Sequence, residues 1–143
     1  MSIKQFISRD VADTERAAAE IAAAYPDGAV IALEGDLGAG KTVFSRGFGR
    51  ALGITEPISS PTYTIIQEYR CPDGRDFYHL DLYRIDNPAA ALAFGVDEYF
   101  DRPGSFALIE WPERIDRLLP DGVVRIKIRH LGENEREIQW ETN

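Results

Sequence analysis

The chain has 143 residues, of which 44% are hydrophobic and 28% charged, and we expect residues 1–143 to form a single soluble domain. The formal net charge of −8 argues against unaided nucleic-acid binding, because the phosphates would repel it. The chain has no apolar run of membrane-spanning length, no apolar signal segment at its start and only one cysteine, so we expect a cytoplasmic protein without a membrane partner.

The first third of the chain predicts a strand, a helix and then a strand–loop–helix unit. Residues 3–7 suit a short strand, and residues 11–25 form an alanine-rich amphipathic pattern with Asp10 as its expected N-cap. Residues 29–33 are an apolar run typical of a buried strand. Residues 42–53 have helical apolar spacing and end in a glycine.

A glycine-rich segment joins this strand to this helix and matches the phosphate-binding pattern G-x-x-x-x-G-K-T. Its residues are Gly35, Asp36, Leu37, Gly38, Ala39, Gly40, Lys41 and Thr42. Glycines let the backbone curl so that its N–H groups face phosphate oxygens, and the helix N-terminus adds a partial positive charge. Lys41 can reach the outer phosphates, and the Thr42 hydroxyl can bind magnesium. The sequence therefore predicts a P-loop for a nucleoside triphosphate.

The middle of the chain predicts an antiparallel hairpin followed by a short helix. Residues 54–61 form a connecting loop, and the β-rich residues 63–69 lead through a turn to a returning strand at residues 77–81. Residues 88–94 suit a short helix that begins at a proline and is capped by Asp86 or Asn87.

The last third predicts a second buried strand and a C-terminal strand pair. Residues 105–109 are apolar and precede Glu110, residues 112–118 can form a helix, and residues 123–129 alternate as in an edge or half-exposed strand. Residues 136–140 can pair with that strand. The fold class is therefore α/β and P-loop NTPase-like, with a mixed, mostly parallel sheet flanked by helices and an antiparallel hairpin.

Two acidic residues compete for the metal position that a P-loop requires on a neighbouring strand. Glu110 ends the uninterrupted apolar run, so we assign it to magnesium, directly or through water. Asp81 ends a more polar strand and either positions water or supports the site; a structural pairing with Arg84 is the alternative.

Three further residues have both a functional and a structural interpretation. Thr62 lies where many P-loop proteins keep a threonine that senses the terminal phosphate, or it belongs to a Ser-Pro-Thr turn. His79 is expected to be a packed core residue rather than a catalytic base. Trp111 either covers the nucleotide or fills the core.

The preferred base follows from a missing motif. The sequence contains only three lysines, Lys4, Lys41 and Lys127, and none lies in the Asn-Lys-x-Asp pattern that recognises guanine. ATP is therefore favoured over GTP.

The motifs taken together resemble the TsaE (YjeE) family of small bacterial ATPases. The matching segments are residues 35–42 (GDLGAGKT), 44–47 (FSRG), 60–64 (SPTYT), 79–84 (HLDLYR) and 110–113 (EWPE). The resemblance covers nearly the full chain, and residues before position 29 and after position 119 are the least distinctive. Several motifs in the same order are far more specific than a P-loop alone.

The resemblance implies a function in making threonylcarbamoyladenosine (t6A) in transfer RNA. The family member is the ATPase of a complex with TsaD and TsaB, and it is thought to reset that complex between turnovers. TsaC supplies the activated threonylcarbamoyl-adenylate. Carried over to this chain, the cofactors are ATP and Mg2+, Thr42 and Glu110 serve magnesium, Asp81 serves hydrolysis and Thr62 is a switch. The acidic chain would meet tRNA only through its partners.

Two other classes of function remain open from the sequence. A small-molecule kinase would want a lid with clustered arginines, but the arginines here are scattered along the chain. A nucleotide-gated binding module would bind ATP and hardly hydrolyse it.

Overall fold

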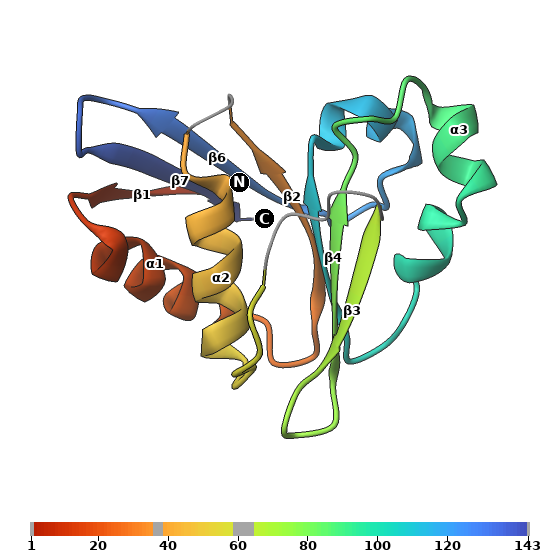
Figure 1. The fold of residues 1–143 in the computed structure, drawn as a ribbon, viewed down its shortest axis with the longest axis horizontal. Helices are drawn as coiled ribbons and strands as arrows, with labels where there is room; N and C mark the ends of the chain where they lie inside the picture. The colour runs from red at the N-terminus through yellow and green to blue at the C-terminus, as the bar shows by residue number, and fades with distance from the viewer. Residues whose placement is uncertain (1, 36–38, 59–64, 143) are drawn as a thin grey trace.

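The computed structural model describes residues 2–35, 39–58 and 65–142. These residues form five helical segments and seven strands. The ribbon of Figure 1 is coloured in chain order, from red at the N-terminus to blue at the C-terminus. In chain order the elements are β1 (Ser2–Ser8), α1 (Val11–Ala23), β2 (Ala29–Glu34), α2 (Lys41–Ala51), β3 (Ile66–Arg70), β4 (Asp76–Asp81), α3 (Pro88–Ala93), the 3-10 segment η1 (Val96–Tyr99), β5 (Phe106–Glu110), the 3-10 segment η2 (Pro112–Leu118), β6 (Val124–His130) and β7 (Arg136–Thr142).

The strands of the described residues form one seven-stranded mixed sheet in the order β1-β7-β6-β2-β5-β4-β3. The central strand β2 runs parallel to both β5 and β6, and β5 also runs parallel to β4. The antiparallel pairs are β3 with β4 at one end of the sheet and β6–β7–β1 at the other. The predicted α/β class, with parallel central strands and an antiparallel hairpin, is confirmed.

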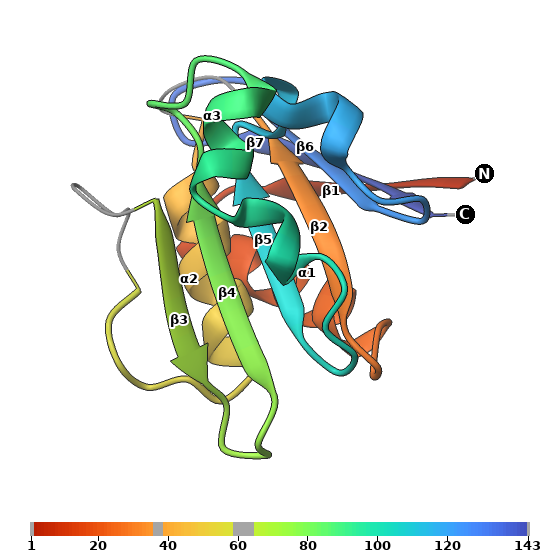
Figure 2. The ribbon, with the colours of Figure 1, turned by 90° about the vertical axis from the view of Figure 1, so that its right-hand side faces the viewer.

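The sheet is covered by different helices on its two faces, as Figures 1 and 2 show: α1 and α2 lie on one face, and α3 with the 3-10 segments lies on the other. Strand β5 is buried throughout because it contributes to both layers. Its Phe106 and Leu108 enter the core under α1 and α2, whereas Ala107 and Ile109 enter the core under α3 and η2.

The two helices on the first face begin where the sequence predicts and are held by apolar packing. The Asp10 side chain accepts a hydrogen bond from the backbone N–H of Asp13 and so caps α1. Helix α2 buries Phe44 and Phe48 completely, and the Phe48 ring meets the Phe106 ring of β5 edge-on at a centroid distance of 5.2 Å. This packing fixes the N-terminus of α2 at the end of β2. None of the described helices is long and apolar enough to cross a membrane.

Two sequence predictions need correction. Residues 112–118 form 3-10 turns rather than one helix, because the backbone breaks at Ile115 (φ −133°), whose side chain is completely buried in the second core. Strand β6 lies inside the sheet between β2 and β7, so the edge interpretation is wrong and the half-exposed one is correct. The predicted strand at residues 63–69 is observed from Ile66 onward, and residues 63 and 64 lie outside the described ranges.

Candidate active site

The candidate site lies where the parallel strands β2, β5 and β4 end side by side. In the register of the sheet, Glu110 of β5 is opposite Leu33 of β2 on one side and Asp81 of β4 on the other. The P-loop leaves the end of β2 and enters α2 at the same edge. The parallel topology therefore brings Lys41 of the P-loop to the same edge of the sheet as Glu110 and Asp81, the two acids that the sequence predicts.

Glycine is required at the end of the P-loop nearest the helix. Gly40 has φ +102° and precedes α2 without any side-chain cap, so the helix N–H groups are left to other acceptors. A Cβ at Gly35 would lie 2.8 Å from the carbonyl oxygen of Ile128, so the start of the loop also excludes a side chain. The P-loop residues Asp36, Leu37 and Gly38 lie outside the described ranges.

Helix α2 presents Lys41 and Thr42 in its first turn. Lys41 is 6% exposed, and its Nζ lies 3.7 Å from the centroid of the Trp111 ring. The first turn of α2 contains no acidic side chain, so its partial positive charge is not neutralised within the helix. An N-terminus of this kind, with a lysine beside it, favours an anion such as a phosphate.

Glu110 is a buried carboxylate held by a buried histidine. Glu110 is 3% exposed, and its Oε2 accepts a hydrogen bond of 2.5 Å from Nε2 of the fully buried His79. The bond with His79 uses Oε2, so Oε1 is the carboxylate oxygen that can bind another ligand. His79 is packed in the core as predicted, but the sequence did not indicate its contact with Glu110.

Asp81 is more accessible than Glu110 and has an altered acidity. Burial raises the pKa of the Asp81 carboxyl above its ordinary value of 3.8. The Tyr83 backbone N–H, which donates to Oδ1 at 3.1 Å, opposes this shift in pKa, and the charge of Glu110 adds to it. The ion pairs of the described residues include none between Asp81 and Arg84, so the structure gives no support to the purely structural alternative.

Trp111 lies over the P-loop lysine and not wholly in the core. It follows Glu110 directly and is the one described non-glycine residue with a positive φ, at +60°. Its half-buried ring contacts both the Lys41 ammonium and the Tyr83 ring, the latter at a centroid distance of 5.1 Å. The only signal in the sequence was an aromatic residue placed between a strand-ending acid and a proline.

The residues present fit a magnesium ion of the P-loop type rather than a metal cluster. No group of three or more His, Cys, Asp or Glu side chains that could hold a metal occurs in the part of the chain that the structure describes. Magnesium in nucleotide sites binds one or two protein oxygens and fills its other positions with water and phosphate. A Glu110 carboxylate oxygen and the Thr42 hydroxyl, the two ligands that the sequence predicts, are oxygens of the kind that magnesium binds. Thr62, the predicted switch residue, lies outside the described ranges.

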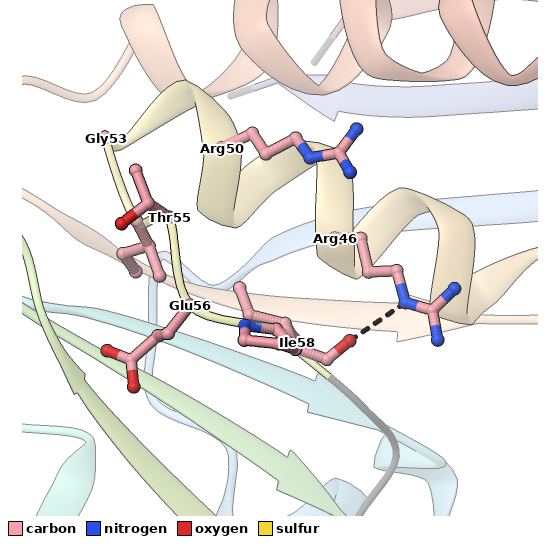
Figure 3. A pocket seen from close by; sticks show the side chains of 8 residues that line it. Arg46, Arg50, Gly53, Thr55, Glu56 and Ile58 are labelled. Atoms are coloured by element: carbon pink, nitrogen blue, oxygen red, sulfur yellow. Dashed lines mark hydrogen bonds between the residues drawn. The ribbon is translucent and has the colours of Figure 1, made fainter.

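Two cavities differ in their relation to this site. One of about 610 Å3 lies along α2 and the loop that follows it, where Nε of Arg46 donates to the carbonyl oxygen of Ile58 at 2.9 Å (Figure 3). It includes none of the candidate catalytic residues. The second, of about 440 Å3, is lined by Gly35 and Trp111 and therefore borders the P-loop.

Comparison with known proteins finds relatives that match most of the chain. A family model described as "Threonylcarbamoyl adenosine biosynthesis protein TsaE" matches residues 8–138. The "tRNA threonylcarbamoyladenosine biosynthesis protein TsaE" of Bacillus subtilis is 45% identical over 141 residues, which cover 96% of this chain and 86% of the relative. The protein of the same name from Synechocystis is 42% identical and covers 80% and 73% of the two chains.

A solved structure gives the same result in three dimensions. The crystal structure of Bacillus subtilis YdiB superimposes with a TM-score of 0.80 at 38% sequence identity, over 97% of this chain and 84% of that one. The match therefore extends across the seven-stranded sheet and the candidate site, and this chain belongs to the TsaE family.

Proposed function

We propose that this chain is a magnesium-dependent ATPase of tRNA t6A biosynthesis, which acts with TsaD and TsaB and resets their complex between turnovers. One observation carries the proposal. Lys41 at the N-terminus of α2, the buried Glu110 and the half-buried Asp81 converge at the carboxyl ends of adjacent parallel strands. That edge is where ligands bind in open α/β sheets.

The P-loop residues bind and orient the triphosphate. Lys41 neutralises charge on the outer phosphates. We assign the backbone cradle around the phosphates to the preceding residues of the P-loop, which are Gly35, Asp36, Leu37, Gly38, Ala39 and Gly40. Thr42 and Glu110 would hold magnesium, which would stabilise the negative charge that develops on the phosphates during transfer. His79 keeps the Glu110 carboxylate in the required orientation.

Asp81 acts on the attacking water, and Thr62 senses the terminal phosphate. The raised pKa of Asp81 suits this role, because a less acidic carboxyl is a stronger base toward water. Its partial exposure, compared with the burial of Glu110, leaves it accessible to a water molecule. The chemistry would then produce ADP and free phosphate.

The choice of ATP and the link to tRNA rest on sequence and family. The chain lacks a guanine-recognition motif. Its relatives are named for threonylcarbamoyladenosine biosynthesis, so we place this chain in the same cytoplasmic pathway. The net charge of −8 favours contact with tRNA through TsaD and TsaB rather than directly.

The test is to incubate the purified chain with ATP and magnesium, alone and with TsaD and TsaB. We expect slow release of phosphate by the chain alone and faster release in the complex, since a missing catalytic group can cost about 10³–10⁵ in rate. A phosphorylated acceptor would instead indicate a kinase, and bound but intact ATP a binding module.

The two acids provide a sharper test, because their roles predict different failures. Glu110→Ala should weaken magnesium-dependent binding of a non-hydrolysable ATP analogue as well as hydrolysis. Asp81→Asn should leave that binding nearly intact and slow single-turnover hydrolysis. Calorimetric titration with and without magnesium distinguishes the two, and the opposite pattern would mean that the roles are reversed.

A further inference from the structure

Arg136 contacts the P-loop from the far end of the chain. It is the first residue of β7, and its Nε donates a hydrogen bond to the carbonyl oxygen of Ala39 at 2.9 Å, across 97 residues of sequence. None of the motifs that identify the family includes it. Of the ion pairs that join described residues, none involves Arg136, so this contact with the loop is not part of a surface salt bridge.

The same side chain packs directly against the next residue of the loop. A Cβ built on Gly40 would lie 2.5 Å from Nε and 2.7 Å from Cδ of Arg136, closer than atoms can approach. The backbone of Arg136 is itself fixed, because the sheet pairs it with His130 on β6 and with Ser8 on β1. Arg136 is therefore a half-buried side chain on a fixed backbone, and it contacts the Ala39–Gly40 peptide just before α2.

The orientation of that peptide decides where its N–H points. The described residues contain no cis peptide bond, and in a planar trans peptide the C=O and N–H groups point in opposite directions. Because Arg136 holds the Ala39 carbonyl on one side, the Gly40 N–H must point to the other. Gly40, at φ +102°, lacks the Cβ that would restrict rotation of this peptide, so the bond from Arg136 supplies the restriction.

We propose, building on the function above, that Arg136 is a positioning residue that locks the Ala39–Gly40 peptide with the Gly40 N–H directed at the bound phosphates. Without the lock, the peptide can rotate and the cradle loses a donor to a charged acceptor. Arg136 acts through the loop backbone, and its donor atom rather than its charge carries the effect.

Two neutral variants of equal length separate the donor from the charge. Arg136→Gln places an amide nitrogen at the position of Nε, and Arg136→Met places a methyl group there. We expect the methionine variant to bind a magnesium complex of a non-hydrolysable ATP analogue about tenfold more weakly, as for loss of one hydrogen bond to a charged group. The glutamine variant should stay within about threefold of the wild type. Calorimetry measures both affinities.

A second probe locates the effect on the ligand. Inorganic tripolyphosphate carries the phosphates without base or ribose, so the methionine variant should lose affinity for it by the same factor as for the nucleotide. Arg70→Met is the matched control. Arg70 is an exposed arginine that is paired with Asp76, and it lies at the end of the β3–β4 hairpin opposite to Asp81, so its loss should change neither affinity.

Three results would overturn the positioning role. Equal weakening in the glutamine and methionine variants would assign the effect to charge, and unchanged tripolyphosphate binding by the methionine variant would assign it to the nucleoside. Wild-type affinity in a folded methionine variant would show that the contact is not needed. A wild-type chain that binds neither probe would instead overturn the proposed function, and this inference with it. Circular dichroism melting of each variant checks that the fold is retained.

Discussion

Replacing His79 by leucine should destabilise the fold through Glu110, and a second substitution should restore it. The two side chains are 0% and 4% exposed and share a hydrogen bond of 2.5 Å, so removing the imidazole leaves a carboxylate buried without that partner. Breaking a buried pair in this way costs about 3–5 kcal/mol, a large part of the roughly 5–15 kcal/mol that stabilises a typical domain.

The double variant His79→Leu/Glu110→Leu removes the buried charge together with its partner. Replacing a buried pair by apolar side chains of similar volume is often neutral or stabilising, so the double variant should recover most of the free energy of unfolding. Its ATPase activity should not recover, because the proposed magnesium ligand is gone. The single variant should also lose about 10- to 100-fold in magnesium-dependent binding, as do other sites that lose the partner of a ligand.

Urea unfolding of the wild type, both single variants and the double variant gives the coupling between the two residues. If His79 holds Glu110 in place, the double variant will be clearly more stable than His79→Leu. If His79→Leu costs less than about 1 kcal/mol, or if the two substitutions simply add, the contact does not hold Glu110 and the reasoning fails.

Three further predictions follow from the same site. Lys41→Ala should lower ATP hydrolysis by about 10³-fold or more while circular dichroism stays native, and unchanged turnover would rule out the P-loop assignment. Asp81→Asn should raise the free energy of unfolding while it slows hydrolysis. Because burial raises the pKa of Asp81, the stability that its protonated form provides is complete below pH 3.8 and is lost as pH rises through the raised pKa. The difference in the free energy of unfolding between Asp81→Asn and the wild type, measured in urea, should therefore widen over that pH range and then stay constant. A difference that does not change with pH would contradict the effect of burial on Asp81. Gly40→Ala should cost more stability than Gly74→Ala in thermal melts, because both have positive φ but only Gly40 has a neighbour in the way, and equal losses would count against the contact with Arg136.

The sequence predicted the elements of the site because its signals there are local. An apolar run, a glycine-rich loop and a helical pattern in immediate succession indicate β2, the P-loop and α2 without any knowledge of the rest of the fold. Glu110 was found for the same reason, as a carboxylate at the end of an apolar run. Glycine at position 40 permits the positive φ that the structure shows there.

The remaining contacts depend on strand order and register, which local patterns do not encode. His79 meets Glu110 only because β4 lies parallel to β5, and Arg136 meets Ala39 only because the C-terminal hairpin lies next to β2. The sequence predicted the hairpin that contains Asp81, but it did not indicate the second, parallel pairing of β4 with β5. That pairing puts both acids on one edge of the sheet.

The most direct test of the proposed function is multiple-turnover t6A formation in a mixture of TsaC, TsaD, TsaB, unmodified tRNA, ATP and this chain. We predict that the wild-type chain lets t6A accumulate well beyond one equivalent per TsaD–TsaB complex. Lys41→Ala, which lacks the phosphate-binding ammonium and which we expect to retain the fold, should hold t6A near one equivalent. Equal accumulation with the wild type, with Lys41→Ala and without this chain would contradict the proposal that ATP hydrolysis at this site resets the complex.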